Sequence, residues 1–143
     1  MLNHLCQLKD TQPDQYTRCS FQLDAMSIRR QIVYNQHTGR MCGMVDLANN
    51  EETDDEAKEV LVFMLVGIQG RWKAPIAYFF TNTLSAATQK ELVVHALEEV
   101  HSRGFQAVAL TIDAHSTNAS VCQLLGCCFE VGDLFQTWFV LPE

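Results

Sequence analysis

Apolar and polar side chains alternate along residues 19–26, a pattern that predicts a β-strand with one buried face. Phe21 and Leu23 share the face that we expect to be buried. Gln22 and Asp24 share the opposite face. Asp24 is therefore expected to point away from the core, near the end of this strand.

The next apolar stretches predict two antiparallel hairpins followed by a single strand. The first hairpin is short and turns at residues 35–39, where Asn and Gly favour a turn. The second is long, with residues 60–68 and 75–81 on either side of a Gly-containing turn, and Pro75 is tolerated at the first position of its strand. Residues 105–112 form a nearly continuous apolar run, which is typical of a central strand covered on both faces.

Two helices are predicted on either side of this last strand. Before the strand, apolar residues recur at helical spacing over residues 92–100. This helix is expected to begin at a capping box formed by Thr88 and Glu91, or alternatively at Ser85. After the strand, residues 118–125 predict a short second helix.

This order of elements predicts an α+β fold with a mixed β-sheet. A right-handed helical crossover can set the strand that ends at Asp113 beside the strand that carries Asp24. The chain has 143 residues, of which 48% are hydrophobic, and this suits one domain with a substantial core. We assign residues 1–18, which are polar and show little periodicity, to a leader, and residues 19–143 to the domain.

Composition narrows the function classes. The formal net charge of −7 argues against a stand-alone domain that binds DNA tightly, because phosphate neutralisation supplies most of the affinity of such domains. No apolar stretch approaches the roughly 20 residues that a membrane span needs, so no membrane association is expected. The six cysteines lack Cys-x-x-Cys spacing and include an adjacent pair, so reduced thiols are expected rather than a disulfide framework.

Asp24 and Asp113 are the strongest candidate site residues. Each follows a β-rich apolar stretch and begins a more polar one. On neighbouring strands their side chains would meet about 5 Å apart, which suits a divalent cation held by carboxylates. Taken alone, either aspartate could instead cap a loop or form an ion pair.

The sequence around the two aspartates resembles the RNase H-like catalytic domain of P-element-type DNA transposases, including those fused to a THAP zinc finger. The resemblance extends from about residue 21 to residue 138. The motifs that carry it follow one another in a single order: LDAMSIR at 23–29, GMVDL at 43–47, TIDAHSTN at 111–118 and LLGC at 124–127.

The resemblance implies DNA cleavage and strand transfer at a site with two Mg²⁺ or Mn²⁺ ions, for which Asp24 and Asp113 are the ligands. It also implies that Asn118 orients a phosphate or a water, although capping of the short helix explains an Asn there equally well. DNA as a partner and a nuclear location follow from the resemblance alone.

The chain also departs from this family. A third carboxylate, a glutamate on a late helix, and a nucleotide-binding insertion have no counterpart here. We therefore expect a C-terminally incomplete RNase H-like fold that binds metal weakly and is inactive alone.

Two other functions stay open. One is a non-catalytic, domesticated interaction module that pairs through an open sheet edge with a fuller relative; a homo-oligomer is a further possible partner. The other is a small ligand-binding α/β domain, which the lack of a Gly-rich phosphate loop disfavours.

Overall fold

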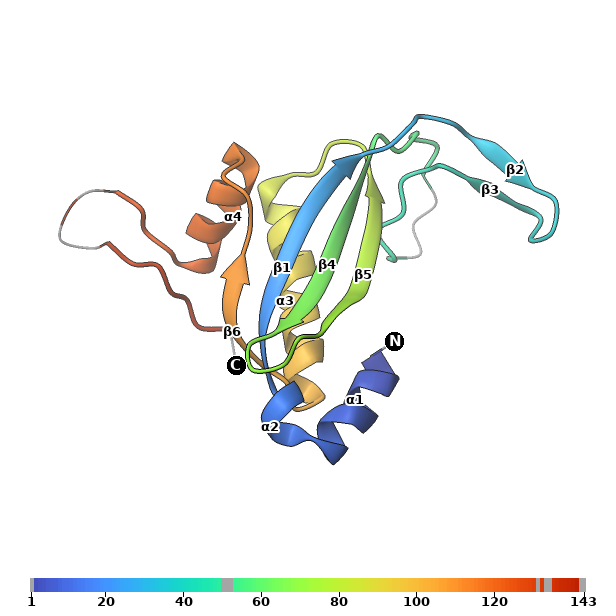
Figure 1. Ribbon diagram of the computed structural model, residues 1–143. Helices are drawn as coiled ribbons and strands as arrows, with labels where there is room; N and C mark the ends of the chain where they lie inside the picture. Colours follow the sequence, from blue (N-terminus) through green and yellow to red (C-terminus); the bar gives the residue numbers. More distant parts are fainter. Residues whose placement is uncertain (1, 50–52, 131, 133–134, 142–143) are drawn as a thin grey trace.

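The centre of the protein is a four-stranded mixed sheet with two helices on one side (Figure 1). The computed structural model describes residues 2–49, 53–130, 132 and 135–141. The sheet order is β5-β4-β1-β6, and β1 pairs antiparallel with β4 and parallel with β6. The elements are β1 (Arg18–Ser27), β4 (Glu59–Gly67), β5 (Lys73–Thr81), α3 (Ala86–Ser102), β6 (Gln106–Thr111) and α4 (Ser116–Leu125). The α+β class and the neighbouring positions of β1 and β6 confirm the prediction.

The alternation in β1 places its side chains as predicted. Phe21 and Leu23 are buried, whereas Gln22 is half-buried and Asp24 is exposed. The ring of Phe21 packs against that of Phe63 in β4, with a centroid distance of 5.1 Å. Full burial of one such side chain contributes about 1.5–3 kcal/mol, so this face fixes the orientation of the strand and turns Asp24 away from the core.

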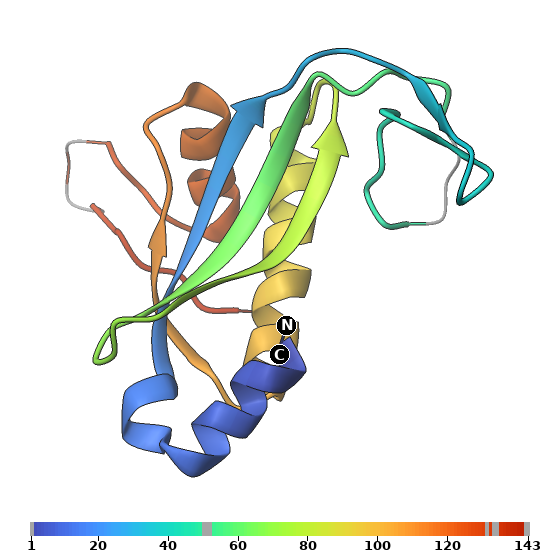
Figure 2. The same ribbon diagram turned by 45° about the vertical axis from the view of Figure 1, so that its right-hand side comes forward.

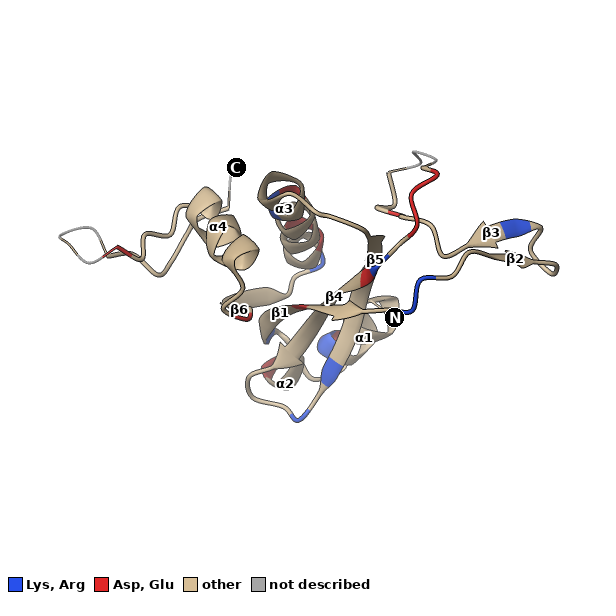
Figure 3. Ribbon diagram, turned by 90° about the horizontal axis from the view of Figure 1, so that it is seen from above, with Lys and Arg blue, Asp and Glu red and all other residues tan. Residues whose placement is uncertain are grey.

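Helix α3 crosses the inner face of the sheet, and α4 lies beside it on the same side (Figures 2 and 3). The apolar stripe of α3 packs into the core through Val93, Leu97 and Val100. The helix begins at Ser85, whose hydroxyl accepts a hydrogen bond from the backbone N–H of Thr88 at 3.0 Å. The alternative start at Ser85 is thus confirmed, and the capping box at Thr88 is wrong, because Thr88 already lies within the first turn.

The segment predicted as a polar leader forms two helices, α1 (Leu2–Thr11) and α2 (Pro13–Tyr16). Leu5 on α1 is 5% exposed and belongs to the same hydrophobic core as the sheet. The Nη1 atom of Arg103, at the end of α3, donates to the side chain of Asn3 at 3.0 Å. These contacts are long-range, and Leu2, Leu5 and Cys6 are the α1 residues that join the described core, so the local sequence pattern did not reveal the helix.

A second, small hairpin projects away from the sheet (Figure 1). It consists of β2 (Val33–Asn35) and β3 (Arg40–Cys42), which pair antiparallel around the predicted turn. At the base of this hairpin, Asp46 forms an antiparallel bridge with Phe80 of β5. The hairpin is thus attached to the sheet through β5 as well as through the end of β1.

Two details of the predicted strands were wrong. Strand β5 begins at Lys73, so Pro75 is inside the strand and not at its first position. Its missing N–H is tolerated there because β5 is an edge strand and its pairing with β4 is irregular between Phe63 and Met64. The apolar run expected to be central is β6, the opposite edge of the described sheet, and most of its residues are exposed.

Candidate functional site

The two predicted aspartates lie near the same end of two neighbouring parallel strands. Gln22 of β1 pairs with Thr111, the last residue of β6; Asp24 follows two residues later within β1, and Asp113 follows two residues after the end of β6. The Ser20 and Thr111 hydroxyl oxygens are 3.0 Å apart, so these two side chains share one face of the β1–β6 pair. Ile112, next to Asp113, packs against the core. The fold therefore brings the two motifs to the same end of the sheet.

The carboxylate of Asp113 is held by the beginning of α4. Its Oδ1 atom accepts a hydrogen bond from the backbone N–H of His115 at 3.1 Å and from the side-chain amide of Asn118 at 2.5 Å. Among the described contacts, neither of these donors reaches Oδ2. The side chain of Asp113 thus has one oxygen fixed by the protein and one available for a further ligand.

Asn118 is 9% exposed and is hydrogen-bonded at both ends of its amide. Its Nδ2 donates to Asp113, and its Oδ1 accepts from Nε2 of Gln89 on α3 at 2.6 Å. The N-cap of α4 is His115, whose Nδ1 accepts from the N–H of Thr117, so capping by Asn118 is wrong. A contact from Asn118 to a phosphate or a water stays a prediction.

Gln89 is the residue of this group that sequence reasoning missed. It is 6% exposed and occupies the first position of the buried stripe that continues through Val93, Leu97 and Val100. A buried amide without partners costs about 1–3 kcal/mol, so a glutamine at an apolar helical position was the available signal. Its partner lies on another helix, which the helical periodicity does not reveal.

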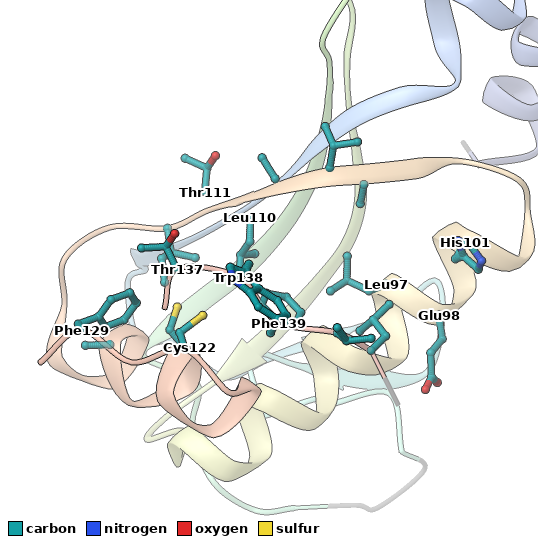
Figure 4. A pocket seen from close by; sticks show the side chains of 18 of the residues that line it. Leu97, Glu98, His101, Leu110, Thr111, Cys122, Phe129, Thr137, Trp138 and Phe139 are labelled. Carbon is teal, nitrogen blue, oxygen red and sulfur yellow. The ribbon is translucent and has the colours of Figure 1, made fainter. Parts of the chain in front are cut away.

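An apolar cavity of about 1080 Å³ lies beside β6 (Figure 4). Leu97 and His101 of α3 line one side, Leu110 of β6 lines another, and Trp138 and Phe139 of the C-terminal segment line a third. Cys122 of α4 also lines it, and burial raises the pKa of its thiol, with a smaller contribution from the charge of Cys127. Asp113 is also among the residues that line it, so the cavity reaches one of the two predicted aspartates.

The hairpin β2–β3 and the segment that leads into it carry positive charge (Figure 3). Arg29, Arg30 and Arg40 belong to this segment, and no Asp or Glu occurs between Asp24 and Asp46. Among the described residues, none of the three arginines forms a salt bridge. Because β1 leads directly into this segment, these charges lie beyond the same end of β1 that carries Asp24.

A mixed sheet of this order, with aspartates at matching ends of two parallel strands and helices packed on one side, defines an RNase H-like domain. The chain belongs to the family described as the TNP-like, RNase H N-terminal domain, whose model matches residues 1–126. This match includes residues 1–18. It confirms the predicted relationship to the N-terminal part of the RNase H-like domain of P-element-type transposases.

Two individual proteins are similar to the chain. The human DNA transposase THAP9 is 27% identical over 122 residues, which are 83% of this chain and 14% of that protein. A solved structure of the Drosophila P element transposase strand transfer complex has a similar fold, with a TM-score of 0.61 and 18% sequence identity. That similarity covers 85% of this chain and 24% of the solved chain. The chain thus spans a small part of the length of each relative.

None of the described helices is both long enough and apolar enough to cross a lipid bilayer. Within the described part of the chain, no three His, Cys, Asp or Glu side chains gather closely enough to hold a metal ion. The predicted ligands are two in number, Asp24 and Asp113, so this finding does not test them.

Proposed function

We propose that this chain supplies the first two carboxylates of a divalent-metal site for DNA cleavage and strand transfer. The observation that carries the proposal is the parallel pairing of β1 with β6, in which Gln22 is level with Thr111 two residues before each aspartate. Membership of the TNP-like, RNase H N-terminal domain family supports it. Asp24 and Asp113 are the proposed metal ligands.

The residues at this position fit a hard divalent cation. Both offer carboxylate oxygens, the donors that Mg²⁺ and Mn²⁺ prefer. Asp113 is oriented through its Oδ1 by two N–H donors, and Asp24 is exposed on the outward side of β1. The chemistry that such ions supply when bound is activation of an attacking oxygen and stabilisation of the leaving oxygen. Because only two carboxylates are available, we expect this site to bind Mg²⁺ or Mn²⁺ with low affinity.

Mn²⁺ titration by calorimetry tests the metal ligands. Asp24→Asn and Asp113→Asn keep the shape of each side chain and remove its charge, so each is expected to abolish the heat of binding. Asp10→Asn is the matched control, because Asp10 lies on α1 with its side chain 71% exposed and pairs only with Lys9 among the described contacts. Equal binding by the wild type and all three variants would end the proposal.

We further propose that the chain is inactive in strand transfer by itself. The support is that, among the described residues, no three His, Cys, Asp or Glu side chains gather closely enough to hold a metal ion. A strand-transfer assay with a labelled DNA end, Mn²⁺ and this chain alone is expected to give no joined product. Joined product that disappears in Asp24→Asn would contradict this part.

DNA is the proposed partner, and the hairpin β2–β3 is the proposed contact surface. The chain as a whole has a formal net charge of −7, so a phosphate backbone would be repelled by most of its surface. The segment with Arg29, Arg30 and Arg40 departs from this balance, and it extends from the same end of β1 as Asp24. A nuclear location is proposed from the resemblance alone, and imaging of a fluorescent fusion tests it.

The second candidate function is the non-catalytic interaction module, and the exposed edge strand β6 favours it. Val108 on this edge is 51% exposed, and an unpaired edge can add a strand from another chain. Light scattering after size-exclusion chromatography is expected to detect a homo-oligomer that Val108→Lys disrupts. A strict monomer over a wide concentration range would remove this candidate.

A further inference from the structure

A chain of buried amides connects helix α3 to the end of β6. Gln89 and Asn118 are each at least nine-tenths buried. Nε2 of Gln89 donates to Oδ1 of Asn118 at 2.6 Å, and Nδ2 of Asn118 donates to Oδ1 of Asp113 at 2.5 Å. Hydrogen bonds therefore connect three residues from three separate segments, and each donor in this series is on the side of α3 while each acceptor is on the side of Asp113.

The direction of this chain follows from donor and acceptor chemistry. An ionised carboxylate only accepts hydrogen bonds, so Asn118 must turn its NH₂ group toward Asp113. Its carbonyl oxygen then points into the protein, where a buried acceptor requires a donor. Gln89 supplies that donor from the first turn of α3. If Gln89 could not donate, Asn118 would lose the contact that holds its amide in this orientation.

We propose that Gln89 is a positioning residue for the Asp113 carboxylate and acts on it through Asn118. The importance of this position for catalysis rests on the proposed metal site, whereas the positioning itself is a property of the metal-free fold. With Oδ1 engaged by Asn118 and by the N–H of His115, the oxygen presented to a cation is Oδ2. Replacing a residue that hydrogen-bonds to a ligating side chain typically lowers metal affinity about 10–100-fold.

The test compares Gln89→Met with Gln123→Met on the whole chain. Methionine keeps the length of the glutamine side chain and removes its donor. Gln123 lies on α4 and is exposed, so its replacement is the matched control. We expect Gln89→Met to weaken Mn²⁺ binding about 10-fold. Gln123→Met is expected to bind as the wild type does.

A second readout does not depend on metal. Nitrogen-15 relaxation in the metal-free protein is expected to show greater motion of the Asn118 side-chain amide in Gln89→Met and no change in Gln123→Met. If Gln89→Met does not fold, Gln89→Glu takes its place. Its carboxylate accepts from Asn118 and cannot donate, which turns the amide round and removes its donor from Asp113.

The outcomes separate the two proposals. If the wild type binds no Mn²⁺, the metal site fails, and the relaxation of Asn118 alone decides the role of Gln89. If the wild type binds Mn²⁺ through Asp24 and Asp113, while Gln89→Met retains that affinity and leaves Asn118 rigid, the positioning role is overturned and the metal site stands. Weakened binding together with a mobile Asn118 supports both.

Discussion

Replacing Leu5 with alanine is expected to destabilise the whole domain and not only helix α1. Leu5 is 5% exposed and packs into the core that also holds the sheet and α3. Buried Leu→Ala changes cost about 2–5 kcal/mol. Because α1 packs at the end of the core, where neighbours can relax, we expect the lower limit of about 2 kcal/mol. That is a large share of a total stability of roughly 5–15 kcal/mol.

Urea unfolding followed by circular dichroism at equilibrium measures this loss as a lower midpoint. In thermal unfolding, about 2–4 °C for each kcal/mol gives a fall in Tm of about 4–8 °C. Leu124→Ala is the matched control, because Leu124 is 55% exposed on α4 and its truncation is expected to cost less than about 0.5 kcal/mol. An unchanged midpoint for Leu5→Ala would show that α1 is a separate leader and that its packing contributes nothing to the domain.

Three further predictions concern the helix start, a buried thiol and the basic hairpin. Ser85→Ala removes the N-cap of α3 and is expected to cost about 1 kcal/mol in urea unfolding, whereas a similar loss in Glu91→Ala would support the capping box at Thr88 and Glu91. Burial raises the pKa of the Cys19 thiol to about 11, so alkylation at pH 8, followed by mass spectrometry, should be far slower there than at exposed Cys42; equal rates would contradict this. Since this thiol ionises more readily in the unfolded chain, stability should fall as the pH rises from the ordinary thiol pKa toward 11. Charge reversal at Arg29 or at Arg30 should weaken DNA binding, measured by fluorescence anisotropy, more than charge reversal at Arg71 in the turn between β4 and β5. Equal effects would contradict the proposal that the hairpin β2–β3 and the segment leading into it contact DNA.

The sequence was sufficient wherever side-chain periodicity and burial coincide. The two-residue period at Phe21 and Leu23 identified the inner face of β1, and with it the outward direction of Asp24. The helical stripe identified α3, but Ser85 and Thr88 are both hydroxyl residues, and only the backbone conformation distinguishes the cap from the first turn. Local pattern therefore predicted the elements better than their boundaries.

What the sequence missed depends on contacts between distant segments. The apolar composition of β6 indicated burial, but composition does not reveal which strand lies next to it, and β6 is an edge of the described sheet. Similarly, the pairing of Gln89 with Asn118 joins two helices, and each residue alone reads as an ordinary polar position. The proposed site could be formulated from the sequence as two carboxylates, whereas the amides that contact one of them could not be predicted.

The irregular pairing of β1 with β6 affects which residue after β6 continues to the level of Asp24. The ladder omits Val108, so that each residue after it pairs one place earlier along β1 than it would in an uninterrupted ladder. In an uninterrupted ladder Ile112 would stand level with Asp24, and alternation of side chains would send Asp113 to the other side of the sheet. The number of residues between the start of β6 and Asp113 therefore decides the side of the sheet to which Asp113 points.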